Sequence, residues 1–323
     1  MTRSSFFRLL FFVFLFCLIN CNPEPPREAK LILVGESAWF EPYKSLSESN
    51  SYLLKNYTQE SKLESIEWPP KDLRRLVDIS VDVTGSCYNT LVTYNNEVIP
   101  LAKYNLLKLC EKLEAGNILL PGDNIILRLF GSNYGDSGAN GRESKGIQIP
   151  PMRIETEIRV LTRKHNDLEL LVKKVISDKF SINATIEDLR KWFMPFVTRS
   201  AKPNERYKES PFLEHVKRVV EESLMSKSVR KVFIFVTDGW FQVGNPNNIL
   251  NFQPSIFDND KSIINKIIDF VQRSNLKPSA EACQNTSIYL IGLNDGGNPE
   301  FRKAQRDLFT WFFEPQKISI IEY

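Results

Sequence analysis

The chain has 323 residues, which is enough for one large domain or two small ones, and 42% are hydrophobic and 25% charged. These values are typical of a globular protein that buries a core. Its 42 basic residues nearly balance 39 acidic ones, and no basic patch stands out, so nucleic acid is not expected as a partner.

Residues 1–20 have the pattern of a signal peptide. Two arginines precede the apolar run Leu9–Ile19, which is too short to span a bilayer. The sequence Leu18-Ile19-Asn20-Cys21 resembles the processing box of bacterial lipoproteins, which implies that Cys21 is lipidated and becomes the mature N-terminus. The alternative is ordinary signal cleavage that releases a secreted protein. The resemblance implies a lipid-anchored protein of the bacterial cell envelope. The outer membrane is favoured over the inner, because Asn22 differs from the Asp that marks inner-membrane retention in some bacteria.

Residues 21–70 are expected to form a tether and an N-terminal extension, and residues 71–323 one α/β domain. The segment Asn22–Lys30 is rich in proline and charge, which suits an extended tether. From Lys71 onward, hydrophobic strand patterns alternate with helical ones. This alternation is typical of a doubly wound, mostly parallel sheet with helices on both faces, as in Rossmann-like folds.

The predicted elements follow from apolar runs and helical periodicity. The predicted strands are Leu76–Asp82, Asn124–Phe130, an edge strand within Gly146–Val160, Val232–Val236 and Ser287–Leu293. The predicted helices are Pro100–Leu113, Asp167–Ile176, Thr185–Phe196, Pro211–Leu224, Ser262–Arg273 and Pro299–Phe313. Loops are expected at Gly131–Lys145 and Gln242–Asp260. Asp78 lies within the first strand, so a partner for its carboxylate is expected.

Two of the strands run into short polar motifs. The first ends in Asp82-Val83-Thr84-Gly85-Ser86, and the strand Val232–Val236 closes on Thr237-Asp238-Gly239. Open α/β sheets bind their ligands at the carboxyl ends of their strands. If the two strands are neighbours, Asp82 and Asp238 therefore meet at that edge, and Thr84 and Ser86 project towards the same point.

D-x-[ST]-G-S after one strand and T-D-G after a later one resemble the von Willebrand factor A domain with its metal-ion-dependent adhesion site, over about Lys71 to Phe313. The resemblance implies a metal held by Asp82, Thr84, Ser86 and Asp238. It also implies a fifth ligand, a hydroxyl on an intervening loop.

Two residues are candidates for the fifth ligand. Ser210 is favoured, because Glu209-Ser210-Pro211-Phe212-Leu213 is similar to the corresponding stretch of the family and leads into the helix before the T-D-G strand. Ser210 also fits an N-cap followed by proline at the first helical position. The rival is Thr185, whose position in an apparent capping box, Thr185-Ile186-Glu187-Asp188, already explains it.

Oxygen ligands without sulfur or imidazole select a hard cation. Mg²⁺ is expected, with Mn²⁺ or Ca²⁺ as alternatives. The resemblance implies that a partner protein fills the remaining coordination position with an exposed Asp or Glu. Trp240 and Phe241 directly follow the second motif, so they are candidates for partner contact, or else core residues that cover the sheet edge.

The sequence leaves two other functions as alternatives. One is a metal-independent scaffold or assembly subunit of the envelope. The other is an aspartate-based phosphatase, which is disfavoured because Thr84 stands where that chemistry needs a second acidic group. The chain is therefore not expected to be an enzyme.

The histidines and cysteines support neither a catalytic site nor a zinc site. His165 and His215 lie in charged surroundings and are expected to be solvated. Cys87, Cys110 and Cys283 match neither a disulfide framework nor a zinc pattern, and whether any two of them pair is left open.

Overall fold

The structure, a computed structural model, divides into two compact units. One unit comprises Met1–Ile66 and Ile154–Val175, and the other comprises Glu67–Arg153 and Ile176–Tyr323. The residues that the structure describes are 29–33, 64–68, 74–115, 118–131, 144–160, 168–176, 179–198, 211–226, 228, 230–245, 248–314 and 318–321.

A six-stranded sheet forms the centre of the second unit. In spatial order its strands are β14 (Ile318–Ile321), β13 (Thr286–Ile291), β10 (Lys231–Val236), β3 (Leu76–Asp82), β6 (Asn124–Phe130) and β7 (Ser144–Gln148). All neighbouring pairs are parallel except β6 and β7, which are antiparallel. Numbered by their appearance in the chain, these strands follow the order 3-2-1-4-5-6 of a doubly wound sheet.

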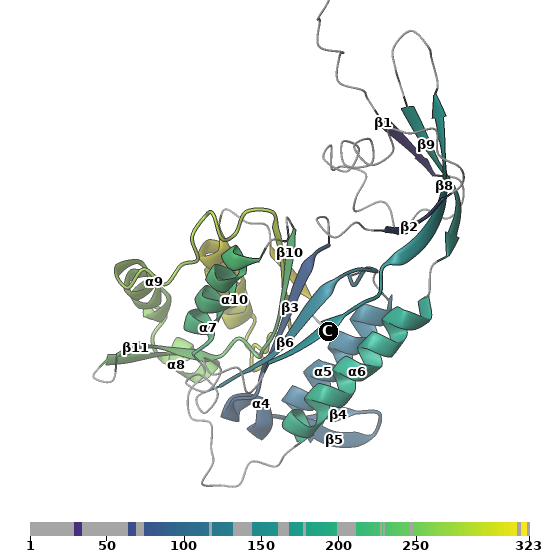
Figure 1. The fold of residues 1–323 in the computed structure, drawn as a ribbon. Coiled ribbons are helices and arrows are strands. Elements are labelled where there is room, and N and C mark those ends of the chain that lie inside the picture. The colour runs from purple at the N-terminus through teal and green to yellow at the C-terminus, as the bar shows by residue number, and fades with distance from the viewer. Residues whose placement is uncertain are drawn as a thin grey trace, which may run out of the picture. The chain divides into compact units, whose positions relative to one another are not determined.

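Helices cover both faces of this sheet (Figure 1). On one face lie α5 (Leu101–Ala115) and α6 (Lys179–Thr198). On the other lie α7 (Phe212–Glu222), α9 (Ile263–Arg273) and α10 (Pro299–Phe313). The predicted fold class, a doubly wound and mostly parallel α/β sheet, is therefore confirmed.

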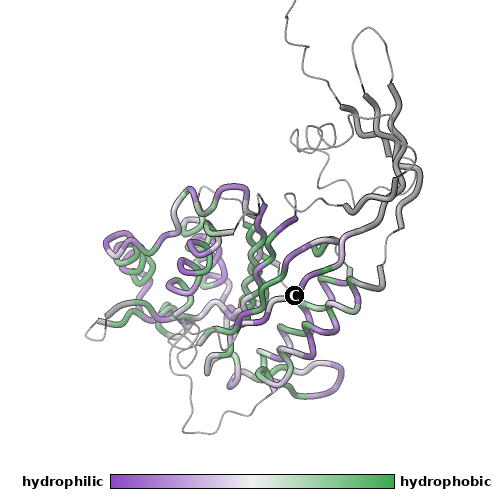
Figure 2. Tube along the Cα trace, viewed as in Figure 1, coloured by the Kyte–Doolittle hydropathy of each residue, from purple (hydrophilic) through white to green (hydrophobic). Residues whose placement is uncertain are grey.

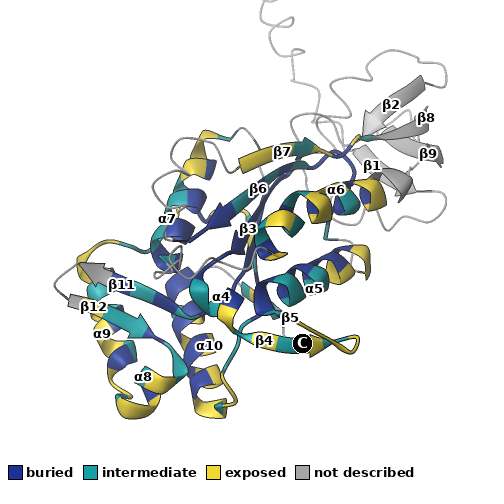
Figure 3. Cartoon of the chain, turned by 90° about the horizontal axis from the view of Figure 1, so that it is seen from below, coloured by how far each residue is buried: buried dark blue, intermediate teal, exposed yellow. Residues whose placement is uncertain are grey.

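The central strands are apolar because both of their faces are covered. Every residue of β3 and β10 is buried, as the dark blue strands in Figure 3 show. Phe235 of β10 packs edge-on against Phe212 of α7, with 5.9 Å between ring centroids. The flanking helices need only one apolar face, and Figure 2 shows hydrophobic and hydrophilic residues alternating along them.

Short elements fill the connections at the sheet edge. After β3 come α4 (Gly85–Asn89) and a hairpin of β4 (Leu91–Tyr94) and β5 (Glu97–Pro100). The 3₁₀ turn η3 (Ser223–Met225) ends α7. After β10 come a hairpin of β11 (Phe241–Asn245) and β12 (Asn248–Phe252), then α8 (Pro254–Asn259). The prediction of a loop over Gln242–Asp260 is therefore wrong.

A four-stranded sheet, most of whose residues belong to the first unit, has the order β1, β9, β8, β2. These strands are β1 (Ala29–Leu33), β9 (Leu168–Ile176), β8 (Met152–Val160) and β2 (Glu64–Trp68). The prediction of a helix over Asp167–Ile176 is wrong, because this segment is a strand that pairs in parallel with β1. Hydrophobic periodicity cannot distinguish a short strand from a helix in an apolar run of this length.

The predicted edge strand within Gly146–Val160 corresponds to the end of β7 and all of β8, with a break at Pro150 and Pro151. The predicted signal peptide, residues 1–20, and the lipidation site Cys21 lie outside the described residues. Within the described residues, no helix is both long enough and apolar enough to cross a bilayer.

A buried ion pair accounts for Asp78, the acidic residue inside β3. Arg128 of β6 donates a 2.8 Å hydrogen bond from Nε to Oδ2 of Asp78, and a second contact, of 3.0 Å, joins Arg128 Nη1 to Glu222 Oε2. The hydroxyl of Ser80 lies 3.3 Å from Asp78 Oδ1. The expectation that Asp78 has a partner is confirmed.

His215 extends this network from α7 and is buried, so the expectation that it is solvated is wrong. Its Nδ1 lies 3.2 Å from Arg218 Nη2, which can only donate, so Nδ1 accepts. Nε2 then carries the proton and donates to Ser80 Oγ at 2.9 Å. Burial lowers the pKa of His215 well below its usual range, and the charges of Arg218 and Arg128 lower it further. The imidazole is therefore neutral.

Asp78 predicts a pH-dependent contribution to stability. Burial raises its pKa to about 6, although Arg128 opposes the shift. The pKa of Asp78 is higher in the folded protein than in the unfolded one. The stability that Asp78 contributes is therefore fully present below about pH 4 and is lost as the pH rises through 6. The free energy of unfolding of the wild type, relative to Asp78→Asn, should fall by roughly 2–3 kcal/mol between pH 4 and pH 7 in urea titrations. Asp307→Asn, at an exposed position of α10, is the control substitution. A difference between the wild type and Asp78→Asn that does not change with pH would contradict the prediction.

Candidate metal centre

Two aspartates from distant parts of the sequence meet at the carboxyl edge of the six-stranded sheet. Asp82 is the last residue of β3, and Asp238 follows the end of β10. These strands are parallel neighbours, with Val81 paired to Val236. The order in which successive strands are added to the sheet reverses between β3 and β10. Open α/β sheets bind ligands at such a switch point.

Asp82 is held by two hydrogen bonds. Its Oδ1 accepts from the backbone N–H of Thr84 at 2.9 Å, and its Oδ2 accepts from the hydroxyl of Thr237 at 2.8 Å. The residue is 1% exposed. These bonds fix the orientation of the carboxylate.

Asp238 is fully buried and only partly satisfied. Its Oδ1 accepts from the backbone N–H of Trp240 at 2.9 Å, but its Oδ2 has no hydrogen-bond partner. Burial raises the pKa of Asp238 to about 7, and the charge of Asp82 adds to the shift. A buried carboxylate with a free oxygen next to a second carboxylate is costly without a compensating charge.

The two hydroxyls of the first motif lie on the turn that opens α4. Thr84 is the N-cap residue of this helix and is buried, and Ser86 in the first turn is half-buried. Their hydroxyl oxygens are 3.3 Å apart. The Ser86 hydroxyl also hydrogen-bonds to Asp238, which opposes the upward shift of its pKa. The structure thus brings Asp82, Thr84, Ser86 and Asp238 together.

Gly239 explains why the second motif ends in glycine. Its φ of +73° lies in the left-handed region. A Cβ at this position would lie 2.7 Å from Leu293 Cδ2 and 2.9 Å from Gln305 Nε2. Gln305 Nε2 also donates to the backbone carbonyl of Asp238 at 3.2 Å, so the tight turn holds Asp238 in place.

The fifth ligand stays a prediction. Ser210 lies outside the described residues. Thr185 is buried within α6, which begins at Lys179, so the capping box expected at Thr185 is not at the start of a helix. That expectation is wrong because the helix extends further towards the N-terminus than its apolar pattern indicated.

The two aromatic residues after Asp238 differ in exposure. Phe241 is 2% exposed and packs against Phe252, with 5.1 Å between ring centroids. It is therefore a core residue, which was the second of the two readings of this pair. Trp240 is half-buried, and its indole N–H donates to the carbonyl of Asn294 at 2.6 Å.

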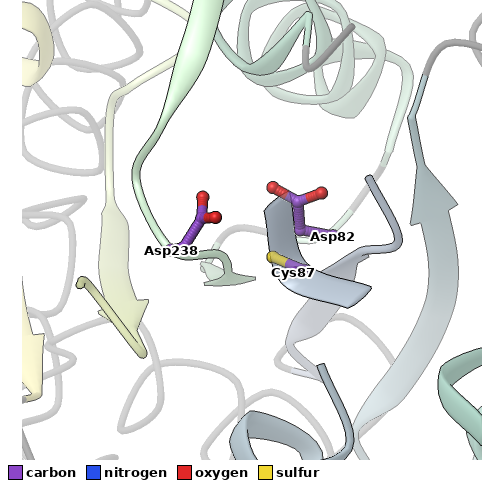
Figure 4. Close-up of side chains that lie close together, drawn as sticks. All are labelled: Asp82, Cys87 and Asp238. Atoms are coloured by element: carbon purple, nitrogen blue, oxygen red, sulfur yellow. The ribbon is translucent and has the colours of Figure 1, made fainter. Parts of the chain in front are cut away.

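Two residues of the site were not predicted. Thr237, which follows β10, orients Asp82 at the end of the neighbouring strand β3. Its position directly before Asp238 in the second motif could have identified it. Cys87 follows Ser86, and one atom each of Cys87, Asp82 and Asp238 lie within 4.8 Å of one another (Figure 4). Cys87 therefore lies beside the oxygen ligands that the sequence predicts. Cys87, Cys110 and Cys283 are all free and buried.

The arrangement fits a small divalent cation. Asp238 Oδ2 is a buried oxygen without a hydrogen-bond partner, and Asp82 supplies a second carboxylate beside it. Hydroxyls of Thr84 and Ser86 add neutral oxygen donors. Carboxylates with hydroxyls suit Mg²⁺ or Mn²⁺.

No protein-family model matches the sequence, and no curated protein matches it. Among solved structures, the chain is similar to the manganese-loaded TRAP protein of Plasmodium vivax, with 15% sequence identity and a TM-score of 0.29 over 81% of this chain and 72% of that chain. A TM-score of this size supports no inference about fold or function. The α/β class therefore rests on the strand order and the helices on both faces of the sheet.

Proposed function

We propose that this chain binds a partner protein in a manner that depends on a divalent cation held by Asp82, Thr84, Ser86 and Asp238. The observation that carries the proposal is Asp238 Oδ2, a fully buried oxygen without a hydrogen-bond partner, next to a second buried carboxylate. The two strand-end motifs, which resemble those of von Willebrand factor A domains, support the same reading.

Each residue of the site has a separate role in holding the cation. A bound Mg²⁺ or Mn²⁺ would supply positive charge and a coordination position open to a carboxylate of the partner. Asp82 is held in orientation by Thr84 and Thr237. Asp238 keeps one oxygen free, and the hydroxyls of Thr84 and Ser86 add donors without adding negative charge. With two carboxylates and two neutral hydroxyls, the charge of the ion is balanced and not exceeded, which leaves it able to accept a carboxylate from a partner.

The proposal includes the location and the absence of catalysis that the sequence predicts. Cys21 in its lipoprotein-like processing box supports an anchor in the bacterial cell envelope, with the outer membrane favoured. Thr84 supports a binding role over an aspartate-based phosphatase, since it supplies no acidic group two residues after Asp82. Trp240, half-buried beside Asp238, is the remaining candidate for contact with the partner.

Isothermal titration of the full chain tests the cation site. The wild type should bind Mg²⁺ and Mn²⁺ with measurable heat, and Asp82→Ala should lose this heat, because the variant removes one of the two carboxylates. The matched control is Asp307→Ala on the exposed side of α10, which should bind as the wild type does. Equal heats for Asp82→Ala and the wild type would contradict the proposal.

Capture of envelope proteins by the immobilised full chain tests the partner. Capture by the wild type should fall at least to the level of Asp82→Ala when EDTA is added. Capture that survives EDTA and is unchanged in Asp82→Ala would favour the alternative, a scaffold whose contacts do not need a metal.

A further inference from the structure

Cys87 occupies a position in the site that the proposed function does not use. It lies in α4, directly after Ser86 of the first motif, and it is 1% exposed. In Figure 4 its sulfur lies beneath the Asp82 carboxylate, on the side that faces Asp238.

The distances place the sulfur within reach of an ion held by the two aspartates. One oxygen of Asp82, one oxygen of Asp238 and Cys87 Sγ all lie within 4.8 Å of one another. Around one tetrahedral zinc-class ion, with bonds of about 2.3 Å to sulfur and 2.0–2.2 Å to oxygen, the ligand atoms lie roughly 3.3–3.7 Å apart. Side-chain rotations that bring the three atoms closer by up to about 1.5 Å would let them contact one ion.

A second observation points to a ligand at the same place. Asp238 Oδ2 is fully buried and has no hydrogen-bond partner, although Asp238 Oδ1 does. Cys110 and Cys283 are also buried and free. Among the described residues, Cys87 is the cysteine that groups with two carboxylates.

We propose that the site also accepts a thiolate-binding divalent cation of the zinc class, with Cys87 as a third protein ligand beside Asp82 and Asp238. The inference rests on the proposed cation site and deepens it by naming the class of ion. Binding forms one metal–sulfur bond and breaks the S–H bond, and the proton passes to the solvent. Thiolate favours Zn²⁺ and Co²⁺ over Mg²⁺, whereas carboxylate and hydroxyl ligands serve both classes.

Cobalt absorption spectroscopy on the full chain tests this proposal, because a Co²⁺–thiolate bond gives a charge-transfer band in the near ultraviolet. The wild type should develop the band with one equivalent of Co²⁺. Cys87→Ser should lose it and bind Co²⁺ about tenfold or more weakly, given that even outer-shell partners are worth 10–100-fold. Mn²⁺ affinity, measured in parallel by titration calorimetry, should change by less than about threefold in Cys87→Ser, because oxygens hold that ion.

Two further variants make the readout specific. Cys283→Ser removes a buried thiol outside the site and should keep the band. Cys87→Ala repeats the test without a hydroxyl, and circular dichroism identifies any variant that fails to fold. A band that persists in folded Cys87→Ser or Cys87→Ala would overturn the inference, as would Co²⁺ binding by the wild type without the band. If the wild type binds Co²⁺ without the band, Mn²⁺ binding still tests the proposed function. A wild type that binds neither Co²⁺ nor Mn²⁺ would overturn both the proposed function and this inference.

Discussion

Asp238→Asn is expected to stabilise the protein in chelator while it removes the response to Mg²⁺. The wild type buries the Asp238 carboxylate beside that of Asp82 and leaves Oδ2 without a partner. The amide removes one of two like charges and keeps an oxygen for the N–H of Trp240. In EDTA the free energy of unfolding should therefore rise by about 1–3 kcal/mol.

Added Mg²⁺ should offset this difference. An ion that binds only the folded wild type stabilises it by about 2.7 kcal/mol at a concentration 100-fold above its dissociation constant. The variant should gain almost nothing, since its neutral amide is a poor ligand for a hard cation. Urea denaturation with EDTA and with Mg²⁺ measures both effects, and Asp307→Asn should follow the wild type in each. A variant that is less stable than the wild type in EDTA would show that the two carboxylates do not repel in the folded protein.

Arg75→Met is expected to be among the most destabilising single substitutions in the α/β unit. Arg75 forms a two-pronged ion pair with Asp123, with Nε 2.9 Å from Oδ1 and Nη2 2.6 Å from Oδ2. Asp123 is 0% exposed and also accepts from the backbone N–H of Leu120 at 2.7 Å. Burial raises the pKa of Asp123, and Arg75 opposes this shift. Loss of the guanidinium leaves a buried carboxylate without its cation, which costs about 3–5 kcal/mol.

The position of this pair explains why the loss should affect the whole sheet. Arg75 precedes β3 and Asp123 precedes β6, and the backbone N–H of Asn124 donates to the Arg75 carbonyl at 2.9 Å. The pair thus joins the beginnings of two neighbouring central strands. Arg190→Met is the matched control, because Arg190 and Glu187 form an exposed pair on α6, and exposed pairs contribute little to stability. Equal losses for the two variants in urea denaturation would contradict the account.

The sequence was sufficient to predict the central strands and the approach of the two aspartates. Leu76–Asp82 and Asn124–Phe130 agree with β3 and β6 in every residue, because strands buried on both faces read as apolar runs with abrupt ends. The carboxyl ends of parallel neighbours share one edge, so Asp82 and Asp238 had to meet once β3 and β10 were paired.

Elements that depend on distant partners were harder to predict. Leu168–Ile176 is a strand because β1, far upstream, pairs with it, and its own residues give no such information. The hairpin of β11 and β12 is short and polar in places, so its sequence reads as a loop. His215 has charged neighbours in sequence, yet the residues one helical turn away from it, Phe212 and Val219, are buried on the same face of α7.

Cys87 shows the same limit within the site. Its sequence position, one residue after the motif, suggests no ligand. The short helix α4 instead turns the chain, so that Cys87 becomes buried next to both aspartates. The local fold, and not the motif, therefore places Cys87 beside Asp82 and Asp238.

The most direct test of the central claim is an anomalous diffraction map from crystals of the protein grown with Mn²⁺. The account predicts a peak between β3 and β10, about 2.0–2.5 Å from Asp238 Oδ2 and within contact of the Ser86 or Thr84 hydroxyl. An anomalous map with no peak at this edge, or electron density for a lysine ammonium between Asp82 and Asp238, would contradict the account.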